Sequence, residues 1–499
     1  MVKRIGLLSA LVLTFAADLD AREEDYYRIV TLPVPETVPF EVSGLERLPD
    51  GRIAAALRRG EVWLVEGAYK EPAEGLRFRR IAQALHEPLG LVRHGDSLYL
   101  AQRSELTRLR DLDGDDEIDE YLTVTDDWGL TGHYHEYAYG PRVDRQGDFW
   151  ITLNAAIGNL TADADAWRGW AVKVTPQGRL VPVATGLRSP CGIGMDGSGE
   201  VFTTDQQGGW VATGALHHVE EGDFYGHPDG LKSCSLPGSP VVCPERIPTG
   251  ITVVEAAKQI PGFKLPAVWF PYRKMGRSAT DLAWDHSPGR FGPFQGQLFV
   301  GDFTDAMISR VFLERVDGQV QGACFRFRDG FQSAVVRLVF GADGSLFVGE
   351  TNRGWNSLGT RSYGLERLVW TGRTPFEVRE MRALPDGFRL TFTGRVDPDR
   401  AAQTDSYRMI SYTYLYHPDY GSPEVETREL NLREARVAAG GRSVDLIVEG
   451  LRPGYVHELH LPGIVSVEGE GLLHARAYYT LNRIPASDPG SDPHARTRP

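Results

Sequence analysis

The chain repeats one hydrophobic pattern six times: an apolar run, a tight turn of the Asp-Gly kind, and a second apolar run rich in β-formers. The copies begin at Gly44, Gly90, Glu136, Cys191, Asp281 and Val335. Such a turn between alternating apolar residues is a strong hairpin signal, because its residues tolerate the positive φ angles of primed turns. Six hairpins predict six sheets.

The spacing of the copies indicates how these sheets are arranged. Most copies start about 45 to 55 residues apart, within the repeat length of four-stranded propeller blades. The interval between the fourth and fifth copies is longer, which predicts an insertion there. We therefore expect an all-β protein whose residues 30–372 form a six-bladed β-propeller.

A different pattern begins after Trp370, where shorter alternating apolar runs follow one another. They predict an immunoglobulin- or fibronectin-like β-sandwich over residues 373–485. Four tyrosines alternate in this region, either as a core-facing aromatic ladder, the commoner arrangement, or as an exposed ligand face. They are Tyr412, Tyr414, Tyr416 and Tyr420. The tail, residues 486–499, has no periodicity and is expected to be disordered.

The N-terminus indicates the compartment. Lys3 and Arg4 precede an apolar run of signal-peptide length, and small residues follow it. This order predicts a signal peptide at residues 1–21 and a secreted or periplasmic mature chain without a transmembrane segment; a retained membrane anchor is the alternative. The formal net charge of −13 argues against nucleic acid and anionic membranes as partners.

The four cysteines fit an oxidising compartment. Cys234 and Cys243 flank a Pro/Gly loop inside the insertion, where we expect a disulfide bridge. Cys191 and Cys324 lie within the repeated motifs and are expected to be buried thiols. The sequence contains no CxxCH motif and thus no c-type haem site of its own.

An acidic loop is the clearest local motif for a metal. Its carboxylates occupy positions one, three, five and nine of a tight turn, as oxygen ligands do in calcium-binding loops. They belong to Asp111, Asp113, Asp115 and Asp119. Asp116 stands where an EF-hand loop has glycine, and Leu122 where it has a bidentate glutamate. We expect a structural calcium ion here; a solvated acidic loop is the alternative.

Two histidines, His133 and His135, come just before the third repeated motif. Inner propeller strands start near the central channel, so the residues before them are expected to ring its mouth. Imidazole titrates near neutrality, so either histidine is a candidate general base. A metal site, with Glu136 orienting one ring, and a purely structural role are the alternatives.

Three polar phrases follow in the fourth repeat: GLRSPCGI from Gly186, TTDQQGGW from Thr203 and GDFYGHP from Gly222. In order and interval they resemble phrases of the quinoprotein glucose/sorbosone dehydrogenases, which are six-bladed propellers. The resemblance covers about residues 38–370. It implies pyrroloquinoline quinone (PQQ) above the channel mouth, activated by calcium. It also implies a sugar or alcohol substrate and an external electron acceptor such as a cytochrome.

The resemblance also implies roles for single residues. The base that takes the hydroxyl proton falls on His135 or His133, and Arg188 would offset negative charge during the reaction. The family's calcium-holding carbonyls fall on Gly208 and Gly209. The cofactor-contacting residues that it implies in this chain are Arg188, Gln206, Gly208, Gly209 and Arg337.

This sequence departs from the family pattern at several positions. Ser189 replaces an asparagine, and Gly209 replaces the proline of the calcium loop. Asp302 and Asp305 stand where the family has a cofactor-contacting lysine, and a carboxylate there would repel an anionic quinone unless a metal intervened. The preceding loop contains two basic residues that are expected to restore positive charge, with an ordinary solvated loop as the alternative. These residues are Lys274 and Arg277.

The sequence therefore favours a secreted quinone-dependent sugar or alcohol dehydrogenase. One alternative is a non-catalytic propeller that binds carbohydrate or a protein, since propellers host many functions. Another is a metal-assisted hydrolase or lyase that uses His133, His135 and a carboxylate such as Asp205.

Overall fold

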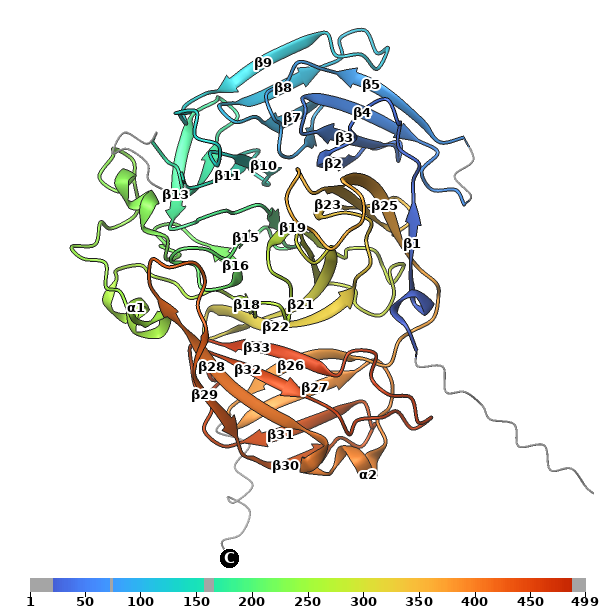
Figure 1. The fold of residues 1–499 in the computed structure, drawn as a ribbon, viewed down its shortest axis with the longest axis vertical. Coiled ribbons are helices and arrows are strands. Elements are labelled where there is room, and N and C mark those ends of the chain that lie inside the picture. The colour runs from blue at the N-terminus through green and yellow to red at the C-terminus, as the bar shows by residue number, and fades with distance from the viewer. Residues whose placement is uncertain (1–20, 72–74, 157–165, 487–499) are drawn as a thin grey trace, which may run out of the picture.

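The computed structural model describes residues 21–71, 75–156 and 166–486 (Figure 1). The expected signal peptide, except for its last residue, and the expected disordered tail, except for its first, lie outside the described residues. No helix in these three ranges is both long and apolar enough to cross a bilayer.

Six antiparallel four-stranded units form a ring (Figure 1), and this confirms the expected six-bladed propeller. The first three blades are β2 (Val42–Arg47), β3 (Ile53–Leu57), β4 (Glu61–Glu66) and β5 (Arg77–Ala82); β6 (Val92–His94), β7 (Ser97–Ala101), β8 (Leu106–Arg110) and β9 (Glu120–Thr125); and β10 (Ala138–Val143), β11 (Phe149–Leu153), β12 (Trp170–Val174) and β13 (Leu180–Thr185).

The other three blades follow the same plan. They are β14 (Ile193–Met195), β15 (Val201–Asp205), β16 (Gly214–Val219) and β18 (Val268–Phe270); β19 (Ala279–Trp284), β20 (Leu298–Asp302), β21 (Met307–Val316) and β22 (Gln319–Arg328); and β23 (Val335–Phe340), β24 (Leu346–Thr351), β25 (Tyr363–Trp370) and β1 (Tyr27–Thr31). Strand β1 comes from the N-terminal end, after the 3-10 helix η1 (Glu23–Asp25), and pairs with β25. This pairing completes the sixth blade with a strand from the start of the propeller sequence, and so closes the ring.

All six repeated motifs form the first hairpin of a blade, as predicted. In the first of them Gly51 has φ +91°, and the Asp50 carboxylate accepts a hydrogen bond from the Arg52 N–H (2.9 Å). Neighbouring inner strands also approach each other closely at glycine. A Cβ added to Gly44 would lie only 2.6 Å from the carbonyl carbon of Gly90. The glycines of the motif thus serve both the turns and the tight centre of the ring.

The predicted insertion lies within the fourth blade, between β16 and β18. It holds the 3-10 helix η2 (Pro228–Ser233), β17 (Ile251–Thr252) and α1 (Val253–Gln259). The Cys234–Cys243 disulfide bridges it with an S–S distance of 2.04 Å, which confirms the predicted pairing. Cys191 and Cys324 are free and buried, also as predicted.

Residues after 372 form two antiparallel sheets with a shared apolar core, which we call the sandwich; its likeness to immunoglobulin or fibronectin domains stays a prediction. One sheet contains β26 (Val378–Leu384), β27 (Gly387–Phe392), β30 (Leu432–Val437) and β31 (Ser443–Val448). The other contains β28 (Arg408–Tyr416), β29 (Glu424–Leu430), β32 (Tyr455–His460) and β33 (Arg476–Leu481). The short helices α2 (Pro398–Ala401) and η3 (Thr404–Ser406) precede β28.

The second of these sheets continues into the propeller. Strand β33 pairs with β22 of the fifth blade, for example at Tyr478 and Cys324, so one nine-stranded sheet spans both regions. Figure 1 shows the sandwich below the ring, on the side of the fifth blade. Because the sheet is continuous, backbone hydrogen bonds as well as side-chain packing hold the sandwich in place.

Strand β28 supplies the aromatic part of this junction. Tyr412, Tyr414 and Tyr416 are buried in a cluster that also contains propeller residues, so they form a ladder rather than an exposed face. The Tyr414 ring lies 5.3 Å from that of Trp269. The fourth tyrosine, Tyr420, lies beyond the strand and is 70% exposed. We call the contacts between the propeller and residues 376–486 the docking interface.

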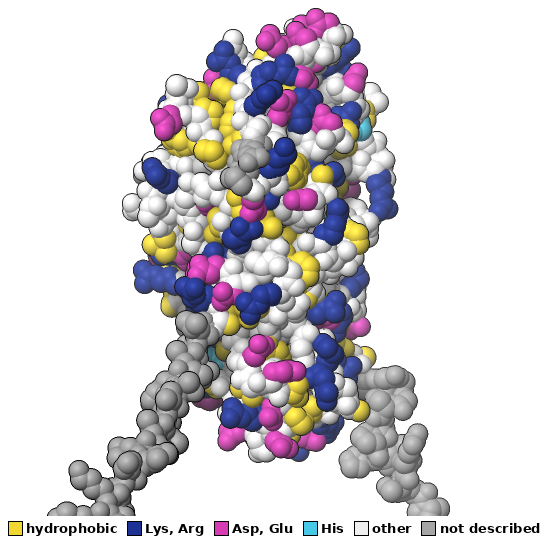
Figure 2. Space-filling view, turned by 90° about the vertical axis from the view of Figure 1, so that its right-hand side faces the viewer, with side chains coloured by type: hydrophobic (Ala, Val, Ile, Leu, Met, Phe, Trp, Pro, Cys, Tyr) yellow, Lys and Arg dark blue, Asp and Glu magenta, His cyan; other side chains and the backbone are white. Residues whose placement is uncertain are grey.

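The surface in Figure 2 carries basic and acidic side chains in alternation along its whole height, with small apolar areas between them. On this face charge of one sign does not gather into a large patch.

Candidate functional site

A pocket of about 700 Å³ lies at one mouth of the central channel. Every blade contributes to it, through residues that precede an inner strand, begin it, or follow the second strand of a hairpin. Arg188, for example, precedes β14, whereas Arg353 follows β24. Tyr420 from the sandwich completes the lining. We call this cavity the channel-mouth pocket; its size is typical of sites for small molecules.

The wall of the pocket is cationic. None of the described residues that line it is Asp or Glu, whereas five are arginines: Arg58, Arg188, Arg277, Arg337 and Arg353. Three of them pair with carboxylates behind the wall: Arg58 with Glu41 (2.7 Å), Arg277 with Asp305 (2.7 Å) and Arg353 with Glu87. The pocket therefore suits an anionic ligand.

Arg188 differs from these paired arginines. Among the described residues no carboxylate forms an ion pair with it, and its Nε is buried without a hydrogen-bond partner. The guanidinium packs against Gly208, where an added Cβ would overlap it. The buried Asp205 carboxylate accepts hydrogen bonds from the backbone N–H groups of Arg188 (2.8 Å) and Ser189 (2.6 Å). Asp205 thus fixes the backbone while the guanidinium stays available to a ligand.

Asp205 and Asp302 do not line the pocket. Burial raises the pKa of each carboxyl to about 6, against the opposing effect of backbone hydrogen bonds. Asp302 accepts hydrogen bonds from the N–H groups of Arg277 (2.8 Å) and Ser278 (2.7 Å), and Asp305 pairs with the Arg277 side chain. The two aspartates at the family's lysine position therefore organise a loop and do not face a ligand.

Arg337 and Gln206, which the resemblance implied as cofactor contacts, also line the pocket. The Arg337 guanidinium is buried and donates hydrogen bonds to the carbonyls of Ser43 (2.6 Å) and Leu89 (3.0 Å), which belong to two other blades. Gln206 donates one to the Ala279 carbonyl (3.2 Å). Arg337 thus ties blades together at the centre of the ring.

Of the two candidate bases, His135 lines the pocket and His133 does not. Burial lowers the pKa of His135 to about 4, helped by the neighbouring His133 and by the positive charges of Arg188, Arg353 and Arg103. Its Nδ1 is buried without a hydrogen-bond partner. At neutral pH the ring is therefore uncharged and able to accept a proton.

His133 and Glu136 shape the turn that presents His135. The Nδ1 of His133 accepts a hydrogen bond from the His135 N–H (3.2 Å). The buried Glu136 carboxylate accepts hydrogen bonds from the N–H (2.9 Å) and hydroxyl (2.6 Å) of Thr131. Glu136 therefore holds backbone and does not orient an imidazole ring.

Three other residues named from the sequence lie beside or away from the pocket. Gly208 and Gly209 stand behind Arg188 and pair with the sandwich: the Gly208 carbonyl accepts a hydrogen bond from the Gly421 N–H (3.0 Å), and Gly209 pairs with Tyr420. Lys274 belongs to the docking interface, where its Nζ pairs with Glu424 (2.8 Å) and Glu458 (2.6 Å). The structure does not bring Lys274 to the pocket.

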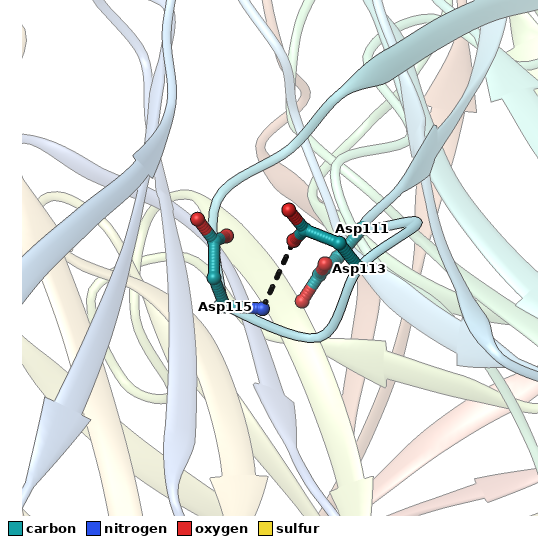
Figure 3. A group of neighbouring side chains, drawn as sticks. All are labelled: Asp111, Asp113 and Asp115. Atoms are coloured by element: carbon teal, nitrogen blue, oxygen red, sulfur yellow. Dashed lines mark hydrogen bonds between the residues drawn. The ribbon is translucent and has the colours of Figure 1, made fainter.

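The acidic loop between β8 and β9 brings three of its four predicted ligands together (Figure 3). Carboxylate oxygens of Asp111, Asp113 and Asp115 lie within 4.8 Å of one another, the one such acidic or His/Cys group among the described residues. Asp119 is outside the group and accepts a hydrogen bond from the Leu112 N–H (2.7 Å). None of these residues lines the pocket.

Several lining residues were not identified from the sequence. They include Arg58, Arg353, Trp355, Tyr272 and, as a pocket residue, Tyr420. Arg58 and Arg353 follow the second strand of a repeated hairpin, as Gln206 does. Arg58 and Gln206 directly follow their strands, so comparing that position across the repeats would have indicated Arg58, whereas Arg353 lies one residue further on. The place of Tyr420 depends on how the sandwich docks, for which the sequence carries no local signal.

Comparisons with known proteins establish the fold. The sequence matches no family model and no curated protein. A solved structure described as a putative oxidoreductase (glucose dehydrogenase) from Thermus thermophilus is 19% identical, with a TM-score of 0.50 over 69% of this chain and 100% of that one. A second, described as glucose dehydrogenase, is 18% identical, with a TM-score of 0.50 over 69% and 99%.

A third solved structure is the PQQ-bound aldose sugar dehydrogenase of Streptomyces coelicolor, which is 14% identical, with a TM-score of 0.48 over 69% of this chain and 98% of that one. At such identities the first two likenesses show a shared fold and no more. The chain thus contains a propeller of the glucose dehydrogenase fold, as the sequence phrases led us to expect.

Proposed function

We propose that this protein is a PQQ-dependent dehydrogenase that oxidises a sugar or alcohol in the channel-mouth pocket. The observation that carries the proposal is the combination of a carboxylate-free, arginine-rich lining with an uncharged histidine on the same wall. The phrases of the fourth repeat and the glucose dehydrogenase fold support it.

The described residues fit the quinone better than its calcium ion. PQQ carries several carboxylates, and the Arg188 guanidinium lies in the pocket lining without an ion-pair partner among the described residues. Gln206 and Arg353 would contact the cofactor from neighbouring blades. The Gly208 carbonyl, which the resemblance assigns to calcium, already accepts the Gly421 N–H, so we assign no calcium ion to this loop.

The protein's own part in the reaction follows from His135 and Arg188. When bound, the quinone would supply the acceptor for the hydride equivalent of the substrate. Because Nδ1 of His135 is buried, Nε2 is the nitrogen that would take the proton of the substrate hydroxyl. The guanidinium of Arg188 would stabilise negative charge that develops beside it. Burial lowers the pKa of His135, and the nearby arginine charges add to this effect; a bound anion would offset the arginine part, raise the pKa and make the imidazole a stronger base.

The proposal also includes an external electron acceptor and a compartment outside the cytoplasm. Electrons would leave for an external acceptor such as a cytochrome, because the sequence has no haem attachment motif. The signal-peptide pattern favours a secreted or periplasmic enzyme.

The test is a titration of the mature chain, residues 22–499, with PQQ, followed by cofactor absorbance and melting temperature. Saturable binding that raises the melting temperature, and oxidation of D-glucose or another aldose with an artificial electron acceptor, are the expected results. Arg188→Ala should weaken binding about 10- to 100-fold, the usual value of a charged hydrogen bond. Arg246→Ala, an exposed arginine of the insertion, is the control. Failure of the wild type to bind the quinone would overturn the proposal.

A further inference from the structure

The sandwich contributes directly to the channel-mouth pocket. The segment between β28 and β29, residues 417–423, extends from the sandwich to the pocket and places Tyr420 in its lining. The three preceding tyrosines of β28 are buried, whereas Tyr420 is 70% exposed. This ring therefore contributes little to the packing of either region.

The segment is held in place by main-chain hydrogen bonds to the propeller loop 206–212. The Trp210 N–H donates to the His417 carbonyl (2.9 Å), the Gly421 N–H to Gly208 (3.0 Å) and the Ser422 N–H to Ala212 (2.9 Å). Residues on both sides of Tyr420 are thus anchored, so its backbone position is fixed before any ligand arrives. Such preorganisation lowers the entropic cost of binding.

Gly421, the residue after Tyr420, allows its segment to lie close to the propeller loop. Gly421 has φ +68°, and a Cβ there would lie 2.6 Å from the side-chain nitrogen of Gln207. Glycine is therefore required both for the backbone conformation and for the approach to the propeller. The local sequence thus permits a contact that keeps Tyr420 over the pocket.

Two other exposed aromatic side chains line the same pocket, Trp355 (49% exposed) and Tyr272 (37% exposed). They come from the sixth blade and from the loop before the fifth. The guanidinium of Arg188 lies 5.5 Å from the Tyr420 ring centroid. Exposed aromatic side chains grouped around a polar cavity indicate a surface for ligand contact. The apolar C–H face of a pyranose ring matches such rings, while its hydroxyls match the adjacent arginine.

We infer that Tyr420 is a specificity-determining residue: its ring forms a platform on which the sugar substrate stacks, so the sandwich is part of the substrate site. This inference rests on the proposed oxidation of a sugar. The sandwich then has a role beyond docking, because it sets the affinity of the pocket for carbohydrate.

The experiment compares Tyr420→Ala and Tyr420→Phe with the wild type, each loaded with PQQ. Tyr420→Ala should raise KM for D-glucose or maltose about 10-fold and leave kcat within about twofold, because a stacking contact is lost but the reacting groups stay in place. Tyr420→Phe keeps the ring and should behave like the wild type. Tyr121→Ala removes an exposed tyrosine of β9, outside the pocket lining, and is the matched control.

A second measurement does not depend on turnover. Quenching of tryptophan fluorescence by the same sugars, with Trp355 in the lining as reporter, is followed without quinone. If the wild type oxidises sugar and Tyr420→Ala has an unchanged KM, the platform is overturned and the proposed function stands. Another outcome is a wild type that does not oxidise sugar and yet shows quenching by sugar. If Tyr420→Ala loses that quenching, the result supports the platform but not the proposed function. Absence of quenching in the wild type overturns the platform.

Discussion

The channel-mouth pocket and the docking interface both remove charged side chains from water. They differ in whether the protein supplies a partner of opposite charge. In the docking interface Lys274 pairs with Glu424 and Glu458. His474 there lies between Glu23 (2.8 Å) and Glu377 (2.6 Å). In the pocket, by contrast, no carboxylate among the described residues forms an ion pair with the Arg188 guanidinium.

This difference distinguishes charged side chains that stabilise the fold from charged side chains that are available to a ligand. A charge taken out of water costs free energy unless another group compensates it. Where the protein itself supplies that group, the charge stabilises one arrangement of the two regions. Where it does not, the cost is left for a ligand to offset. The pocket is thus the region in which a ligand of opposite charge gains most.

The largest expected effect is on the docking interface. Tyr414→Ala removes a buried ring that packs on Trp269, and should lower the free energy of unfolding by about 3–5 kcal/mol. Chemical denaturation measures it, with Tyr121→Ala as an exposed control that should change stability by about 0.5 kcal/mol or less. A loss below about 1 kcal/mol for Tyr414→Ala would contradict a packed interface.

The charge pair at His474 should make stability depend on pH. Glu377 and Glu23 raise the pKa of His474 to about 9, against the effect of its burial; Glu23 also faces Arg328. A raised pKa stabilises the fold below the unfolded value of about 6.5, and this stabilisation is lost between pH 6.5 and 9. His474→Gln should therefore cost on the order of 3 kcal/mol at pH 6 and much less above pH 9.

The measurement is urea unfolding of wild type and His474→Gln at pH 6, 7.5 and 9. The exposed His286 provides the matched control, since His286→Gln removes an imidazole without an ion pair. A penalty for His474→Gln that does not fall with rising pH would show that the imidazole is not charged in the folded protein.

The pocket should couple ligand binding to a proton. Burial and, to a smaller extent, the nearby arginine charges lower the pKa of His135 to about 4. A bound anion offsets the arginine charges, so binding raises this pKa and takes up a proton. Affinity for PQQ should thus increase by about 3- to 10-fold between pH 7.5 and 5 relative to His135→Gln. Calorimetry of both proteins at the two pH values checks this, because titration of the quinone's own carboxylates cancels in the ratio. Equal pH dependence in the two proteins would exclude the coupling.

The smallest expected effect concerns the acidic loop, where three carboxylates lie close together at the surface. If Asp111, Asp113 and Asp115 bind calcium, millimolar calcium should stabilise the protein by about 1 kcal/mol and raise its melting temperature slightly. Asp113→Asn should abolish the shift. Glu117→Gln, an exposed residue of the same loop outside the group, should retain it. A shift that survives Asp113→Asn would place the ion elsewhere.

Much of the fold could be predicted from the sequence because its signals are local. Each repeated motif contains both strands and the turn of one hairpin, so register and turn type follow from neighbouring residues. The Cys234–Cys243 bridge closes a short loop and was predicted for the same reason. Arg188, which the resemblance of its phrase singled out as a cofactor contact, lies in the pocket lining; its contact with a cofactor stays a prediction.

Contacts between distant segments were decided only by the tertiary structure. Lys274 precedes a blade that reaches the pocket, yet its Nζ pairs with two glutamates more than a hundred residues away in the sequence. The carboxylate of Asp302 is turned toward backbone N–H groups, which no spacing rule reveals. Tyr420 continues the alternation of three buried tyrosines but lies past the end of β28, where docking places it in the pocket. A periodic pattern determines which residues can share a strand, whereas the contacts of their side chains depend on where whole sheets meet.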